Sequence, residues 1–155
     1  MLHIYVDADA CPVKQEVYRV AERCGLSVTL VANSTMRVPD EEWISLVIVS
    51  DAPDAADDWI AETAGADDIV VTADIPLAHR CVRAGAQVVG PTGKPFSESN
   101  IGDAVATRNL FTELRESGMQ IGGPPPLTKR DRSRFLQTLD EVVQRIRRQY
   151  RSDDG

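Results

Sequence analysis

The 155-residue sequence is poor in the features that mark disulfide-rich, histidine-metal and membrane proteins. It has three cysteines without a CxxC pair and two histidines without metal-ligand spacing between them. We find no apolar run near the length of a membrane span and no basic-then-apolar leader. These absences favour a cytoplasmic protein with reduced thiols and no membrane partner.

Positively charged residues are scarce in the first two thirds of the chain. Residues 1–107 hold 7 Lys/Arg against 17 Asp/Glu, a balance of −10, whereas residues 108–155 hold 10 against 7, a balance of +3. The acidic part argues against a general nucleic-acid coat, because phosphate binding depends on cationic patches. It leaves open a small acidic metal site that is served by a basic arm.

Short apolar runs rich in β-branched residues alternate with helix-like stretches, and no internal repeat is visible. The predicted strands are Leu2–Val6, Ser27–Val31, Leu46–Val49, Asp68–Thr72 and Ala86–Val89. Runs such as "IVV" and "LVIV" indicate burial on both faces, as in a parallel sheet. We therefore predict a three-layer α/β/α fold with a mainly parallel sheet of about five strands and a C-terminal helical segment.

Helices are predicted between these strands and after the last one. They run from Pro12 to Gly25, from Pro53 to Gly65, from the N-cap Asp74 to Gly85, from about Ile101 to Ser117, and from Thr128 to about Tyr150. We expect an α/β domain at 1–121, a Gly/Pro loop ("GGPPP", Gly122–Pro126) and helix at 122–150 packed on the same domain, and a disordered tail at 151–155. The apolar face of the last helix could also meet a second copy, which leaves a homodimer open.

Acidic residues gather where the predicted strands end. Asp7 directly extends the first apolar strand and Asp9 follows it, while Asp74 comes just after "DIVVT". Asp57 and Asp58 open the helix after the third strand. Because the carboxyl ends of parallel strands meet at one edge of the sheet, these carboxylates should converge there.

Converging carboxylates repel one another unless protons or cations compensate them. Mg²⁺ or Mn²⁺, which prefers oxygen ligands, is the usual compensation and can activate water for attack on a phosphodiester. A plainer interpretation competes with this one: Asp74 and Asp9 could be helix N-caps, and Asp57 and Asp58 solvated surface. Asp7 is harder to explain in that way, because it continues a buried strand.

Four motifs resemble the YaiI/YqxD family of uncharacterised bacterial proteins. They are "VDADACPVK" (Val6–Lys14), "LVAN" (Leu30–Asn33), "VTADIPLA" (Val71–Ala78), and a double glycine followed by "RDR" (Arg130–Arg132). The resemblance covers nearly the whole chain; one departure is "QI" (Gln120–Ile121), where a threonine is expected beside the glycines. That family looks like a branch of the PIN-like nuclease superfamily.

The resemblance implies a metal-dependent nuclease that uses Mg²⁺ or Mn²⁺ and cleaves nucleic acid, with RNA favoured over DNA. Asp7, Asp57 and Asp74 match the acids of PIN-type nucleases and are the expected catalytic residues, with Asp7, Asp9 and Asp74 as metal ligands. Thr72, in the "hhhT-x-D" pattern, is expected in substrate binding.

Three basic side chains are candidates for contacts with substrate phosphates: Arg108, Arg130 and Arg132. A solvated helix face explains them equally well from the sequence. The last two lie in a family-like motif directly after a rigid loop, which favours a functional role.

Two other functions remain open. "VDADAC" carries the D-x-D of haloacid dehalogenase-type phosphatases, although Cys11-Pro12 stands where that class has Thr or Val, and no later lysine and acid pair appears in the usual order. A non-enzymatic nucleotide- or RNA-binding module that retains a metal site is the other alternative.

Overall fold

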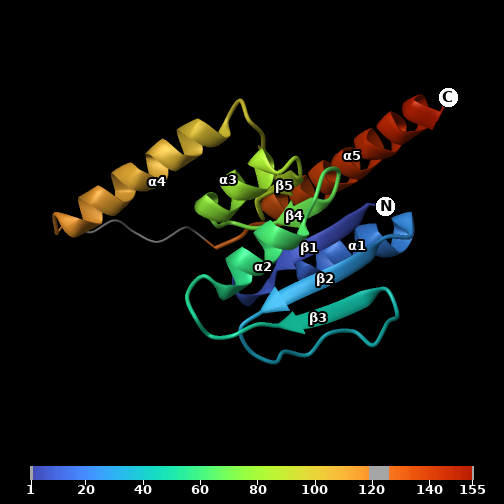
Figure 1. Cartoon of the computed structure of the whole chain (residues 1–155), viewed down its shortest axis with the longest axis horizontal. Coiled ribbons are helices and arrows are strands. Elements are labelled where there is room, and N and C mark those ends of the chain that lie inside the picture. Colours follow the sequence, from blue (N-terminus) through green and yellow to red (C-terminus); the bar gives the residue numbers. More distant parts are fainter. Residues whose placement is uncertain (1, 119–125, 155) are drawn as a thin grey trace.

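The computed structural model describes residues 2–118 and 126–154 and has a six-stranded sheet with helices on both faces (Figure 1). The strands are β1 (His3–Asp7), β2 (Ser27–Ala32), β3 (Ile44–Ile48), β4 (Ile69–Val71), β5 (Gln87–Val89) and β6 (Pro95–Phe96). The helices are α1 (Lys14–Cys24), α2 (Ala55–Thr63), α3 (Ile75–Arg83), α4 (Ile101–Glu116) and α5 (Lys129–Asp154), with a 3-10 turn, η1 (Ala8–Ala10), after β1.

The sheet order is β3-β2-β1-β4-β5-β6, and every neighbouring pair is parallel except β5 and β6. From β1 the chain winds outward through β2 to β3, then crosses back to the other side of β1 and continues through β4 and β5. The carboxyl ends of β1 and β4 therefore lie at the point where the winding reverses, which is where open α/β sheets bind ligands. The sequence did not predict β6, because it is two residues long and lies in a Gly/Pro/Ser loop.

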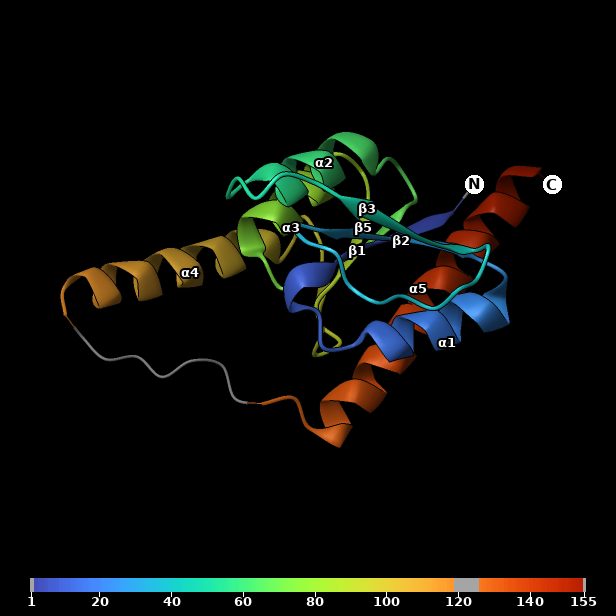
Figure 2. The ribbon, with the colours of Figure 1, turned by 90° about the horizontal axis from the view of Figure 1, so that it is seen from below.

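Helices cover both faces of the sheet, and the predicted three-layer α/β/α fold is confirmed. Figure 2 shows α1 and α5 on one side and α2 and α3 on the other. Side chains along β1 alternate between these layers: Ile4 and Val6 enter the core that contains α1 and α5, whereas Tyr5 packs against the core beneath α2 and α3. In the described residues, no helix combines the length and apolarity that crossing a membrane requires.

The α5 helix is part of the core of the α/β body. Phe135, Leu139 and Val143 are each 0% exposed and belong to the same apolar cluster as β1 and α1. Reciprocal hydrogen bonds between Thr128 and Asp131 form the capping box that begins the helix. The helix continues to Asp154, beyond the expected end near residue 150 and into the stretch that the sequence suggested as a disordered tail.

The first helix can be compared with its predicted bounds, whereas other predicted features lie outside the described residues. The first helix begins at Lys14 rather than in the turn of Pro12, and it ends at Gly25, whose φ of 68° is the left-handed conformation that glycine adopts at least cost. Residues 119–125, which hold "QI" and most of "GGPPP", lie outside the described residues, as does the expected domain boundary at residue 121.

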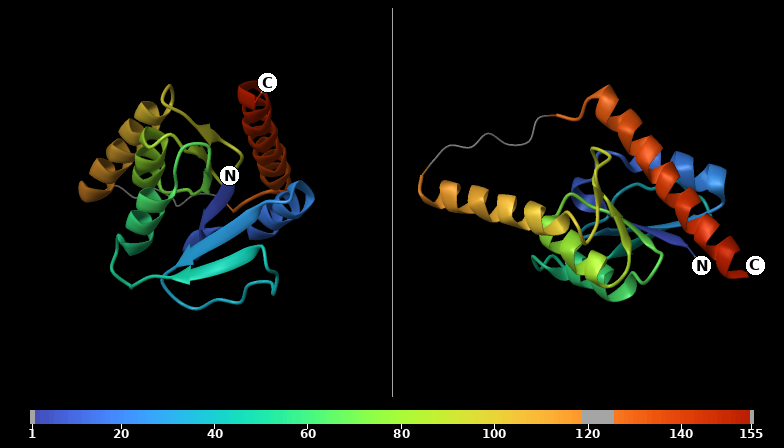
Figure 3. Two further views of the ribbon diagram at one scale, coloured as in Figure 1. Left: turned by 45° about the vertical axis from the view of Figure 1, so that its right-hand side comes forward. Right: turned by 90° about the horizontal axis from the view of Figure 1, so that it is seen from above.

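The α4 helix differs from the others because it extends away from the sheet (Figures 1 and 3). Its first residue, Ile101, is its one buried residue and packs with α3. Leu110 and Phe111 are exposed by 53% and 41%. Most of the surface of α4 is therefore available for contact with another molecule.

Candidate functional site

Strand register places Asp7 beside Thr72. β1 and β4 pair Val6 with Val71, so the next residue of each chain segment lies at the same height. The Thr72 hydroxyl donates a hydrogen bond to Asp7 Oδ2 over 2.9 Å. Thr72 is only 2% exposed, so this contact fixes the Asp7 carboxylate at the end of a buried strand.

Thr72 also links Asp7 to Asp74. The backbone N–H of Asp74 donates to Thr72 Oγ1 over 3.0 Å, while Asp74 Oδ1 accepts from the backbone N–H of Leu77. Asp74 is therefore the N-cap that the sequence suggested, and no hydrogen bond within the described residues occupies its Oδ2. Capping and ligand binding are compatible at this residue.

Asp57 on the first turn of α2 shares an electrostatic environment with this pair. Burial, followed by the charges of Asp74 and Asp7, raises the pKa of Asp57 to about 6. Burial and the charges of Asp74 and Asp9 also raise the pKa of Asp7, against the hydrogen bond from Thr72, which lowers it. The charges of Asp7 and Asp74 thus both oppose the ionisation of Asp57.

The carboxylates of Asp7 and Asp74 open onto a small cavity of about 160 Å³, whose lining does not include Asp57. It is lined by Asp7, Thr72, Asp74, Cys11, Ala73 and Pro91. Burial is the main cause that raises the pKa of the Cys11 thiol, with Asp7 and Glu16 adding to it, so the thiolate needed for nucleophilic chemistry is disfavoured. Carboxylates and a hydroxyl are the reactive groups of this cavity.

The structure sets Asp9 apart from Asp7 and Asp74. Its Oδ2 accepts a hydrogen bond from the backbone N–H of Asn33 at the end of β2, and the side chain is exposed. Asn33 in turn donates to the carbonyl of Ser50 after β3. Asp9 therefore ties together the loops at the ends of β1, β2 and β3 and is absent from the lining of the cavity.

The donor set fits a magnesium-like ion in one specific way. Among residues 2–118 and 126–154, no three His, Cys, Asp or Glu side chains form a metal-ligand group. Mg²⁺, however, is commonly held by one or two carboxylates and completes its coordination with water and substrate phosphate oxygens. Asp7 and Asp74 can supply such a pair, whereas the expected set of Asp7, Asp9 and Asp74 is not brought together.

The three candidate arginines occupy different places. Arg132 donates to the Pro12 carbonyl over 2.7 Å and pairs with Glu16 at 3.3 Å, so it attaches α5 to the beginning of α1. Arg130 is exposed in the first turn of α5. Arg108 lies on α4, where it lines a separate groove described below.

Sequence reasoning missed two groups near the acids. Arg80 on α3 pairs with Asp58 at 2.8 Å and lowers the pKa of Asp57. Pro91 lines the cavity from the turn after β5. A signal for Pro91 was available, because β5 is parallel to β1 and β4 and the loop after it must emerge at the same edge.

Comparison with known proteins identifies relatives over nearly the whole chain. The family described as "Uncharacterized BCR, YaiI/YqxD family" matches residues 5–145. A UPF0178 protein of Nitrobacter winogradskyi is 59% identical over 147 residues, which is 95% of this chain and 94% of the relative. Others from Bradyrhizobium sp. (59%, covering 94% and 89%) and Sphingopyxis alaskensis (58%, covering 94% and 95%) are similar. No solved structure matches.

Proposed function

We propose that this chain, which belongs to the YaiI/YqxD family, is a metal-dependent nuclease of the PIN-like kind that hydrolyses phosphodiester bonds, with RNA favoured over DNA. The observation that carries the proposal is the placement of Asp7 and Asp74 around the Thr72 hydroxyl at the topological switch point of the sheet, where both of their charges oppose the ionisation of Asp57. Such a concentration of like charge destabilises a fold and is typical of a site that binds a cation.

In this proposal Asp7 and Asp74 hold Mg²⁺ or Mn²⁺. The bound ion would neutralise charge on the phosphate and activate a water molecule. We assign Asp57, which lies just outside the cavity lining, as the base that takes the proton of that water, because a carboxyl group with a pKa of about 6 is ionised at neutral pH yet basic enough to take a proton.

Thr72 is a positioning residue in the same scheme. Its hydroxyl donates to Asp7 and accepts from the Asp74 N–H, so both of its hydrogen-bonding functions serve the two proposed metal ligands. We therefore assign it to the site's support and not to direct substrate contact. The proposal also places the protein in the cytoplasm, where RNA is available and the free thiols of its cysteines remain reduced.

A haloacid dehalogenase-type phosphatase has less support. That chemistry needs the second aspartate of the D-x-D pair beside the same substrate as the first. Asp9 instead contacts Asn33 and does not line the cavity next to Asp7.

The test is cleavage of single-stranded RNA with Mn²⁺ or chelator by wild type, Asp7→Asn and Asp74→Asn. Asparagine caps helices as well as aspartate does, so Asp74→Asn should keep α3 intact. We expect each variant to lose at least about 100-fold in rate, while the exposed Asp51→Asn retains activity. Cleavage that survives chelator, or that both variants retain, contradicts the proposal; hydrolysis of a phosphomonoester alone favours the phosphatase.

A further inference from the structure

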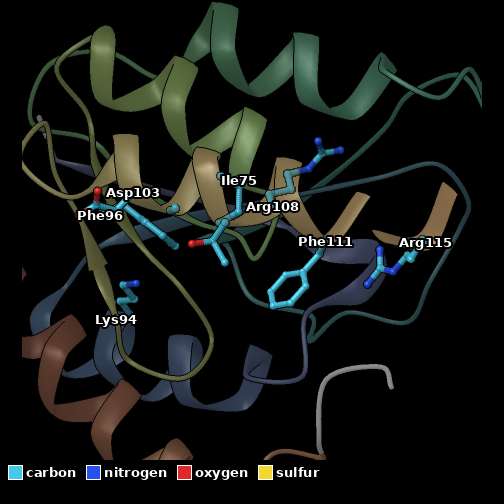
Figure 4. A pocket seen from close by; sticks show the side chains of 9 residues that line it. Ile75, Lys94, Phe96, Asp103, Arg108, Phe111 and Arg115 are labelled. Atoms are coloured by element: carbon cyan, nitrogen blue, oxygen red, sulfur yellow. The ribbon is translucent and has the colours of Figure 1, made fainter. Parts of the chain in front are cut away.

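A groove of about 410 Å³ lies between α4 and the hairpin formed by β5 and β6 (Figure 4). α4 contributes Arg108, Phe111 and Arg115, and the hairpin side contributes Lys94 and Phe96. The groove therefore combines three cationic side chains with two aromatic rings.

The cations of this groove lack acidic partners among the residues that the structure describes. In the described part of the chain, no carboxylate lies within ion-pair distance of Lys94, Arg108 or Arg115, and Asp103 is the one acidic residue in the lining. The Lys94 ammonium lies 5.8 Å from the centre of the Phe96 ring. Residues 1–107 carry a formal charge of −10, so this local excess of positive charge stands out against an acidic body. An anionic ligand complements it.

Apolar surface accompanies the positive charge. Phe111 is 41% exposed at the groove, and its neighbour Leu110 is 53% exposed. An exposed phenyl ring beside arginines is the arrangement that stacks an unpaired base while cations contact the flanking phosphates. A paired base in a duplex does not offer its face to such a ring.

The groove also adjoins the carboxylate cavity. Asp74 lines the cavity and the next residue, Ile75, lines the groove. In the same way, Pro91 lines the cavity and Lys94, in the same turn, lines the groove. The cavity and the groove are therefore joined through the backbone at two places, the start of α3 and the turn after β5.

We propose that this groove binds single-stranded nucleic acid on one side of the phosphate held at the carboxylate cavity. Lys94, Arg108 and Arg115 contact backbone phosphates, and Phe111 stacks against a base. The assignment rests on the proposed nuclease function for the identity of the ligand.

The experiment is fluorescence polarisation of a labelled single-stranded RNA with the full-length chain in an Asp7→Asn background, so that the probe stays intact. We expect Arg108→Ala and Arg115→Ala each to weaken binding about fivefold or more and to reduce the slope of log K against log salt by roughly 0.7. Phe111→Ala should weaken binding about fivefold or more, and Phe111→Trp should restore it. Arg145→Ala, at an exposed position on α5, is the matched control and should bind normally.

Several outcomes overturn the proposal: groove variants that bind like the parent, an equal loss in Arg145→Ala, or tighter binding of a duplex than of a single strand. Sedimentation provides another, because a dimer that Phe111→Ala converts to monomer would make this face an interface between two copies. RNA-cleavage assays on the groove variants, made without the Asp7→Asn substitution, separate this proposal from the proposed nuclease function. If cleavage occurs and groove variants bind and cleave normally, only the groove assignment fails; if groove variants lose binding but nothing is cleaved, only the nuclease fails.

Discussion

Two regions of the molecule contribute to its stability in opposite ways. One is the carboxylate edge of the sheet, formed by Asp7, Asp57 and Asp74, and the other is the contact between α1 and α5. At the edge, Asp7 and Asp57 have raised pKa values because burial and neighbouring carboxylates oppose their ionisation. At the α1–α5 contact, Phe135 and Leu139 are fully buried, and an ion pair between Arg23 and Asp140 lies at its margin.

This difference shows where the fold gains stability and where it loses it. Burial of each large apolar side chain on α5 contributes about 1.5–3 kcal/mol, whereas like charges at the edge reduce stability at neutral pH. A protein that retains such an edge is expected to use it, because stability is commonly lost where a site binds or reacts. Removing a side chain from the α1–α5 contact should therefore lower the free energy of unfolding, whereas removing a charge from the carboxylate edge should raise it at neutral pH.

The largest effect is expected inside the α1–α5 contact. Phe135→Ala should lower the free energy of unfolding by about 3–5 kcal/mol, because it leaves a cavity in a fully packed core. Phe111→Ala on α4 removes an equal side chain from an exposed position and should change it by less than about 0.5 kcal/mol. Urea unfolding followed by circular dichroism measures both; equal losses would mean that α5 is not the more deeply packed helix.

A smaller loss is expected where α5 meets the turn after β5. Gly93 has φ of 87°, and a Cβ there would lie 2.7 Å from Arg134 Cγ and 2.8 Å from the Arg134 backbone carbon. Gly93→Ala should therefore destabilise the chain by about 1–3 kcal/mol through strain and overpacking.

Gly102 in the first turn of α4 provides the control for Gly93. A Cβ there meets nothing within 4 Å, so Gly102→Ala should leave stability unchanged or raise it by up to about 1 kcal/mol. If both alanine variants melt at the wild-type temperature, α5 does not hold this turn in the way described.

The smallest expected effect is a stabilisation, caused by the substitution Asp57→Asn, and it depends on pH. The pKa of Asp57 rises from 3.8 to about 6 on folding, so between these values the folded chain binds more protons than the unfolded chain. The free energy of unfolding contributed by Asp57 therefore falls as pH rises through this window and stays low above it. Asp57→Asn should raise the melting temperature at pH 7 and lose this advantage near pH 4.

Asp58→Asn tests whether the gain is specific to Asp57. Asp58 pairs with Arg80, and both side chains are about half exposed, so its removal should give no stabilisation at pH 7. Thermal melts of the two variants across this pH range provide the comparison. An equal rise in both would mean that the general negative charge, and not the coupling to Asp7 and Asp74, destabilises the edge.

Much of this architecture could be predicted from local patterns. Apolar runs located the five parallel strands, and Asp74 and Thr128 marked the beginnings of two helices correctly. The convergence of Asp7 and Asp74 followed from parallel pairing alone, because strand ends share an edge whatever their order. These features depend on the spacing of apolar, capping and acidic residues along the sequence, which can be read directly.

Other features depend on contacts between residues that are distant in the sequence, which the spacing of residue types does not reveal. Asp9 looked equivalent to Asp7, but the backbone of Asn33, distant in sequence, decides where its carboxylate points. The guanidinium of Arg132 bonds to Pro12 and Glu16, and its motif gave no sign of either contact. The groove on α4 required knowledge of how that helix leaves the sheet, which no periodicity encodes.

The central claim is that Asp7 and Asp74 form a divalent-cation site, and titration of Mn²⁺ followed by electron paramagnetic resonance tests it most directly. The account predicts a Mn²⁺ site in the wild-type chain that is lost in Asp7→Asn and in Asp74→Asn and retained in Asp51→Asn, which removes an exposed carboxylate from the same edge. Binding should also raise the melting temperatures of the wild-type chain and of Asp51→Asn, but not those of Asp7→Asn and Asp74→Asn. Wild-type protein that binds no Mn²⁺, or Asp7→Asn protein that binds it as tightly as wild type, would contradict the account.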